Sequence, residues 1–213
     1  MKKGFSVAVI GLAGVVGMIG PPATGETILE DFESYHDGQI IGSTATSKPW
    51  SRFGAATNDN MVATSHERWV ISGSHSAIYG LVWPNSFGAV RYRFDQATDL
   101  SPYHGVAVKM RSSKNNTHTQ VKLAISNGYT TFVSVADRPL GVRVQPLVFE
   151  LGPTQMIRVV GRHSYREVVQ GAWQIGFDFS NIEDQDFETI AFDQLTLTTL
   201  SDAAPKTKVS ALE

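Results

Sequence analysis

The chain of 213 residues contains no cysteine. A disulfide framework and any chemistry that depends on a thiol are therefore excluded. Its six histidines are scattered without a pair at the spacing of zinc ligands, which argues against a zinc site. If distant segments need a clamp, a hard metal ion held by oxygen atoms is the type of clamp that remains.

Charged residues are also scarce, at 18% of the chain, and the formal net charge is −2 at pH 7. A weakly acidic protein is poorly suited to wholesale binding of nucleic acid or an anionic membrane, so we expect neither partner. The sequence shows no internal repeat and no persistent helical periodicity. Its many short alternating or β-branched runs, separated by turn-forming residues, predict an all-β fold with two antiparallel sheets packed as a β-sandwich.

A hydrophobic run, residues 5–19, follows a basic start with Lys2 and Lys3, and small residues follow it up to Gly25. This pattern is typical of a secretory signal peptide, and the run is shorter than the ~20 residues of a membrane-spanning helix. We expect residues 1–25 to be cleaved near Gly25, which makes the protein secreted or periplasmic without membrane insertion. The rest predicts one monomeric sandwich domain over 26–200 and a polar C-terminal tail over 201–213.

The strands are expected near residues 28–35, 50–56, 68–72, 76–83, 88–95, 105–112, 119–126, 130–136, 143–151, 155–161, 172–180 and 187–199. Asn127-Gly128 between two of these runs is the clearest hairpin signal in the chain. Residues 162–170 form the only plausible helical turn.

Strand-like segments at the two ends of the mature chain both carry acidic side chains. Residues 28–35 include the three acids Glu30, Asp31 and Glu33, and residues 189–197 include Asp193 near the apolar Phe192 and Leu195. A carboxylate in a buried strand costs free energy unless something compensates it, and calcium with several oxygen ligands would do so. We hypothesise that the chain ends lie side by side and share such an ion. Solvated charges on an edge strand are the alternative.

Three segments resemble a known group of proteins. They are Leu29-Glu30-Asp31-Phe32-Glu33-Ser34-Tyr35 with the later Trp50, the loop and strand over residues 99–111, and Phe192-Asp193-Gln194-Leu195-Thr196-Leu197. Together they resemble galactose-binding-like jelly-roll domains, above all the family 11 carbohydrate-binding modules. They are also similar to families 4 and 22 of such modules and to the mitochondrial complex-I assembly factors.

This resemblance implies a jelly roll that binds sugar chains in a cleft across one sheet. It also implies a structural calcium ion held by backbone oxygens, by Glu33 of the first strand and by Asp193 of the last, with Asp31 as a third carboxylate. The sequence departs from the cellulose-binding pattern because it has no obvious row of exposed aromatic residues.

The alternation of strands 88–95, 105–112 and 119–126 places five basic residues on polar faces: Arg91, Arg93, Lys109, Arg111 and Lys122. If these strands share one sheet, the five side chains line a cationic cleft for an acidic or mixed polysaccharide. Arginine grips a carboxylate with two parallel hydrogen bonds, which suits a uronate. The alternative is that they are ordinary surface charges.

Aromatic side chains are the other candidate sugar contacts. Trp69 and Trp83 flank turns, and Tyr129 lies at the Asn-Gly hairpin, so we predict that these three stack on sugar rings. Trp173 alternates with Ile175 and Phe177 and is predicted to lie in the core.

No catalytic motif stands out, so we expect a non-catalytic carbohydrate-binding protein. The chain has no Gly-x-Ser-x-Gly motif and no Glu-x-Asp pattern of a family 16 hydrolase. The first alternative is a jelly-roll polysaccharide lyase or hydrolase; in a lyase, Arg91 and Arg111 would neutralise a uronate, with His118 or Tyr129 as base. The second alternative is a structural envelope or protein-interaction domain.

Overall fold

The computed structural model describes residues 26–43, 49–54, 61–81, 86–114, 119–181 and 188–199. Within these ranges the strands are β1 (Thr27–Glu30), β2 (Ile40–Ser43), β3 (Trp50–Gly54), β4 (Met61–Thr64), β5 (Ser76–Leu81), β6 (Ser86–Thr98), β7 (Gly105–Ser112), β8 (Thr119–Ser126), β9 (Thr131–Ser134), β10 (Arg138–Pro139), β11 (Gln145–Glu150), β12 (Met156–Val160), β13 (Ala172–Asn181) and β14 (Glu188–Thr198). One short helix, α1 (Tyr165–Gln170), precedes β13.

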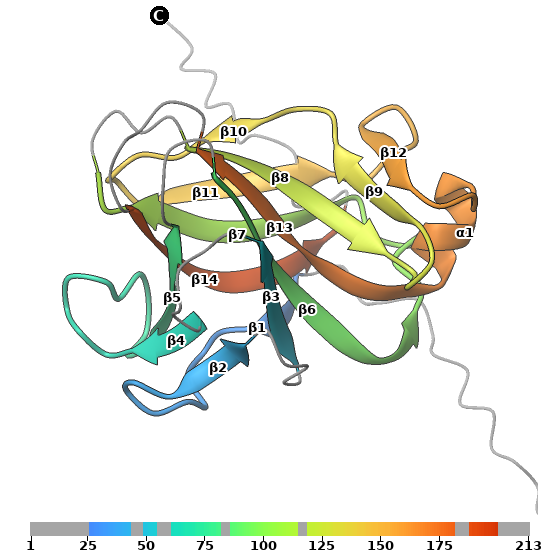
Figure 1. Ribbon diagram of the computed structural model, residues 1–213. Helices are drawn as coiled ribbons and strands as arrows, with labels where there is room; N and C mark the ends of the chain where they lie inside the picture. The colour runs from blue at the N-terminus through green and yellow to red at the C-terminus, as the bar shows by residue number, and fades with distance from the viewer. Residues whose placement is uncertain are drawn as a thin grey trace, which may run out of the picture.

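The strands form two layers that pack face to face (Figure 1). The first layer has the order β11-β7-β14-β5-β4, with β1 also paired to β14. The second has the order β3-β6-β13-β8-β9-β12, with β10 beside β8. Strand β2 pairs antiparallel with β4 and parallel with β3, so the sheet curls from one layer into the other. The predicted all-β, antiparallel sandwich is confirmed.

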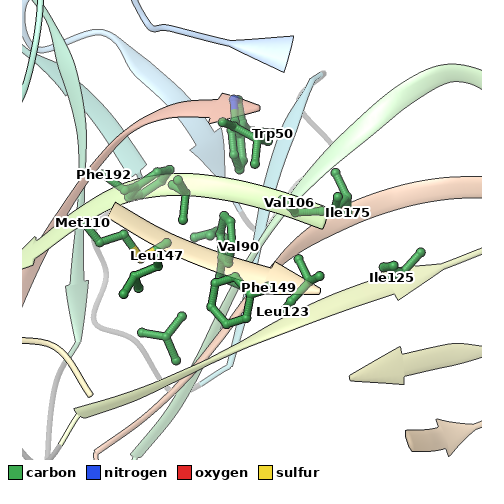
Figure 2. Packing of buried hydrophobic residues seen from close by; sticks show 14 of the residues in the cluster. Trp50, Val90, Val106, Met110, Leu123, Ile125, Leu147, Phe149, Ile175 and Phe192 are labelled. Carbon is green, nitrogen blue, oxygen red and sulfur yellow. The ribbon is translucent and has the colours of Figure 1, made fainter. Parts of the chain in front are cut away.

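The core lies between the two layers and contains residues from both. The inward side chains of the central strands are Val106, Val108 and Met110 of β7, Val121, Leu123 and Ile125 of β8, and Ile175, Phe177 and Phe179 of β13. Figure 2 shows several of them in a single cluster with Phe149 of β11. The rings of Phe149 and Phe177 lie 5.9 Å apart across the two layers. Since side chains alternate along a strand, the residues between these point to two opposite outer faces.

Local backbone geometry explains where the predicted strands end. The strands expected over 105–112 and 119–126 are confirmed. The first strand ends at Glu30 and not at Tyr35, because Phe32 has a left-handed backbone with φ of 60°. The strand expected over 68–72 is wrong: these residues form a turn and a bend, and the amide of Trp69 donates to the carbonyl oxygen of His66 (2.7 Å).

The predicted helical turn is confirmed as α1, which a capping box holds in place. The hydroxyl of Ser164 accepts a hydrogen bond from the amide of Glu167, and the Glu167 carboxylate accepts one from the amide of Ser164. No helix in the described ranges is both long and apolar enough to cross a membrane.

Candidate functional site

The structure divides the five predicted basic residues between the two layers. Arg91 and Arg93 lie on β6 and Lys122 lies on β8, whereas the remaining two, Lys109 and Arg111, lie on β7 of the other layer. All five alternate with core residues, so the two groups point away from each other. The prediction of one cleft lined by all five is therefore wrong. Alternation gives the face of each strand, but it does not say which strands share a layer.

The outer surface of β6, β13 and β8, called the β13 face below, has a paired set of charges at its centre. Arg91 lies opposite Gly176 of β13, and its side chain crosses this glycine to form an ion pair with Asp178. Its Nη1 also donates to the carbonyl oxygens of Val90 and Phe177, each at 3.0 Å. The guanidinium of Arg91 is therefore fully engaged with its own sheet.

Lys122 is the second charge on this face that has a partner. It lies opposite Asp178 in the β13–β8 register, and its Nζ forms an ion pair with Asp137 at 3.3 Å. Arg93 is different, because no described residue accepts a hydrogen bond from its guanidinium and its neighbour across the register is the neutral Gln174.

An open hollow of about 380 Å³ lies where the β13 face meets the β8–β9 hairpin. Its lining residues are Arg93, Asn127, Gly128, Tyr129, Trp173 and Gln174. The hairpin is held by Asn127, whose Oδ1 accepts hydrogen bonds from the amides of Tyr129 (3.1 Å) and Thr130 (2.9 Å). The Tyr129 side chain is 79% exposed, and its ring packs edge-on against His163 at 6.1 Å. An aromatic ring is thus presented to solvent in a fixed position.

Trp173 lies at this hollow and not in the core, so its predicted core position is wrong. The register between β13 and β6 shifts between Ala172 and Gln174. The extra residues lie in β6, which runs from Arg93 to Thr98 while β13 runs from Gln174 to Ala172, and such a bulge disrupts the regular ladder beside Trp173. Ala172 is fully buried, while Trp173 is only partly buried. The position of Trp173 at the start of the predicted strand 172–180 was the available signal, but the bulge itself has no signature in the sequence.

A second aromatic side chain marks the opposite end of the β13 face. Phe87 of β6 is 47% exposed and lines a smaller hollow of about 200 Å³ with Lys122, Asp178 and Ser180. Phe87 pairs with Ser180, and Arg93 pairs with Gln174, so the two hollows lie six register positions apart. At about 3.3 Å per residue this is roughly 20 Å of strand, which is the length of an oligosaccharide site and not of a single sugar.

Trp69, another predicted sugar contact, falls outside the β13 face. The guanidinium carbons of Arg68 and Arg111 lie 5.1 and 5.5 Å from the centre of the Trp69 ring. Trp69 therefore belongs to the outer side of the first layer. Trp83 and His118 lie outside the described residues. Because Arg91 and Arg111 are on opposite outer faces, the arrangement considered for a lyase does not form one site.

The predicted proximity of the chain ends is confirmed. β1 pairs antiparallel with β14, with Thr27 opposite Leu197. Asp193 of β14 is fully buried and accepts hydrogen bonds from the amide (3.0 Å) and hydroxyl (2.7 Å) of Ser72 and from the hydroxyl of Ser76 (3.3 Å). Glu33 accepts from the amides of Ser74 (2.9 Å) and His75 (3.2 Å) and from the Ser74 hydroxyl. The two carboxylates thus converge on residues 72–76, called the serine loop below.

Burial and hydrogen bonding shift the pKa values of these two carboxylates in opposite directions. Burial raises the pKa of Asp193, although the hydroxyl and amide of Ser72 oppose the shift. The Ser74 hydroxyl lowers the pKa of Glu33. No ion pair joins Asp193 to a basic residue within the described ranges, so its buried charge is compensated by hydrogen bonds alone. That is the environment in which a cation would offset the cost of burial.

The fit of a calcium ion depends on oxygen atoms beyond these two carboxylates. The described residues contain no group of three His, Asp or Glu side chains that could hold a metal. Asp31 is exposed, and its Oδ1 accepts the amide hydrogen of Glu33 at 3.2 Å. Calcium also takes backbone carbonyl and hydroxyl oxygens, which the serine loop can supply beside Glu33 and Asp193. The donor chemistry therefore suits calcium and does not suit zinc.

No family model matches the sequence, and no curated protein matches it. Solved structures do match the fold, and they are jelly-roll β-sandwiches of the carbohydrate-binding-module type. The family 11 module of the cellulosomal cellulase Lic26A-Cel5E from Clostridium thermocellum is 12% identical, with a TM-score of 0.56 over 84% of this chain and 96% of the module. The fold predicted by the resemblance is confirmed.

Two further matches show the range of proteins with this fold. A family 11 module from Clostridium thermocellum, solved in complex with a β-1,3-1,4-mixed-linked tetrasaccharide, is 10% identical with a TM-score of 0.56, over 84% of this chain and 98% of that one. An exo-β-agarase is 15% identical with a TM-score of 0.53. The match covers 81% of this chain but only 25% of the agarase, so there the fold is one part of a larger protein.

Proposed function

We propose that this protein binds carbohydrate on the β13 face without cleaving it. The observation that carries the proposal is the hollow in which the exposed Tyr129 and the partly buried Trp173 lie beside the side-chain amide of Gln174. Aromatic faces pack against the apolar side of sugar rings, and amides both donate to and accept from hydroxyl groups. A family 11 module of the same fold was solved with a tetrasaccharide, which supports the same class of ligand here.

In this proposal the ligand is an acidic or mixed polysaccharide, and the protein is secreted or periplasmic. Hydrolysis at this face is not part of the proposal, because that reaction needs two carboxylates that flank the bond. Among the described residues of β6, β13 and β8 on this face, the central carboxylate is Asp178, and Arg91 already binds it.

Retardation in native affinity gels tests this function. We expect retardation by at least one of a panel of neutral glucans, galactans and uronate polymers, and we expect Trp173→Ala and Tyr129→Ala each to weaken binding about tenfold, since buried aromatic contacts dominate binding energy. Val148→Ala, on the opposite outer face, is the control and should bind normally. Absence of retardation by every polymer would refute the proposal, as would the appearance of unsaturated product from a uronate polymer.

We also propose that Glu33, Asp193 and oxygen atoms of the serine loop hold a structural calcium ion, with Asp31 as an additional carboxylate nearby. Such an ion would tie β1, β14 and the serine loop together in a chain that has no disulfide. The converging carboxylates support this, as does the burial of Asp193 without a basic partner in the described ranges.

Thermal and urea unfolding with calcium or with chelator test the calcium site. A ligand that binds only the folded state adds about 2.7 kcal/mol to the free energy of unfolding at a concentration one hundred times its Kd. We expect calcium to stabilise the wild type and not Asp193→Asn. Asp99→Asn, which changes an exposed carboxylate that caps the amide of Ser101, should keep the full effect. A wild type that melts identically with calcium and with chelator would exclude the site.

A further inference from the structure

We infer that Arg93 recognises an anionic group of the sugar ligand, a carboxylate or a sulfate ester, next to a ring that stacks on Trp173 and Tyr129. This inference rests on the proposed carbohydrate-binding function and names the class of ligand for the same hollow. The observation behind it is that Arg93, unlike Arg91 and Lys122, has no acidic partner among the described residues of the β13 face.

The other two cations of the face cannot serve an incoming anion without losing an existing partner. Arg91 binds Asp178 and two backbone carbonyl oxygens, and Lys122 binds Asp137. The Arg93 side chain has no such partner among the described residues, although its backbone amide fixes the strand through the carbonyl oxygen of Pro49 (2.6 Å). An arginine that is held by its backbone and whose guanidinium has no partner among the described residues is available for a carboxylate or sulfate oxyanion.

The surroundings of Arg93 favour an anion because the hollow contains no carboxylate. Its other lining side chains are two amides and two aromatic rings, which are all neutral. Asp95, the next residue on the same side of β6, is exposed, makes an interaction of its own and does not line the hollow. Asp178 lies farther from the hollow along β13, two residues beyond Gly176, and it is bound to Arg91.

The same arrangement predicts a ligand of mixed charge and not a uniformly charged polymer. One positive group lies beside amides that suit hydroxyls, and the next charges along β13 neutralise each other. A sugar chain with one anionic ring between neutral rings would match these groups. A second anion on the adjacent ring would meet no free cation of the described part of this face.

The test compares matched oligosaccharides that differ only in charge. One pair is a galacturonate tetramer and its methyl ester, and the other is a sulfated galactan tetrasaccharide and its desulfated form. Isothermal titration should show that wild-type protein binds the charged member of at least one pair more tightly, by roughly tenfold to a hundredfold, as charge-assisted hydrogen bonds imply. The pair that shows the preference identifies the anion as carboxylate or sulfate.

Arg93→Gln should abolish the preference while it retains binding of the neutral member. Arg143→Gln is the matched control, since it removes the same charge from an exposed loop before β11 and should keep the preference. Unfolding curves of both variants establish that each is folded. Two results would overturn the role of Arg93 and leave carbohydrate binding intact. One is equal affinity of the wild type for the charged and neutral members of both pairs. The other is an Arg93→Gln protein that keeps the preference for the charged member. A protein that binds none of the four oligosaccharides and none of the polymers above would refute the proposed function itself.

Discussion

Replacing Trp50 with alanine is expected to lower the free energy of unfolding by about 3–5 kcal/mol, the range for a buried tryptophan truncated in a core. Trp50 is fully buried on β3, and its ring lies 5.4–5.7 Å from the rings of Tyr92, Phe32 and Phe192. Its Nε1 also donates to Glu30 at 3.2 Å, so the substitution leaves a carboxylate oxygen with one donor fewer. Urea denaturation followed by fluorescence or circular dichroism measures the change.

The control for this experiment is the alanine substitution of Trp173, the tryptophan at the hollow. Trp173→Ala removes a partly exposed side chain, so we expect a much smaller loss of stability together with the loss of sugar affinity described above. Trp50→Ala should show the opposite behaviour, with binding retained by the folded fraction. A loss below about 1 kcal/mol at Trp50 would mean that the junction of β3 with the chain ends contributes little to the core.

Gly176→Ala is the second change with a large expected effect, at about 3 kcal/mol or more, because overpacking against backbone has no easy relaxation. A Cβ at this position would overlap the carbonyl oxygen of Val90 and lie 2.8 Å from the Cα of Arg91. The variant should therefore unfold at lower urea concentration.

Gly152→Ala provides the matched glycine control. A Cβ there meets only the Cγ of Gln155, at the ordinary contact distance of 3.6 Å. We expect its stability to stay within about 0.5 kcal/mol of the wild type. If Gly176→Ala and Gly152→Ala have the same free energy of unfolding, the close approach of β6 and β13 at Gly176 does not prevent a larger side chain there.

Short-range patterns in this sequence predicted the parts of the fold that depend on neighbours along the chain. Strands 105–112 and 119–126 followed from strict alternation, the β8–β9 hairpin from Asn127-Gly128, and α1 from a lone helical segment. Paired acidic strands at the two ends also indicated correctly that β1 and β14 lie together. In each of these segments the alternation, the turn residues or the acidic side chains are visible in a short stretch of sequence.

The binding face was harder to predict because its parts come together through long-range pairing and irregular backbone. Nothing local to β7 shows that Lys109 lies in the layer opposite Arg91 and Arg93. An irregular register between β6 and β13 left Trp173 at the hollow and not at the expected core position, and the left-handed Phe32 ended the first strand early. Such irregularities change which side a residue faces, and a pattern of period two cannot reveal them.

The antiparallel pairing of β1 with β14 has a practical consequence for attachment. Because Thr27 lies opposite Leu197, the polypeptide enters and leaves the sandwich at neighbouring points on its first layer. A fusion partner, surface tether or neighbouring domain joined at one of these points would therefore start beside the other. A linker or label added at either end should accordingly be long enough to leave the β1–β14 pairing undisturbed.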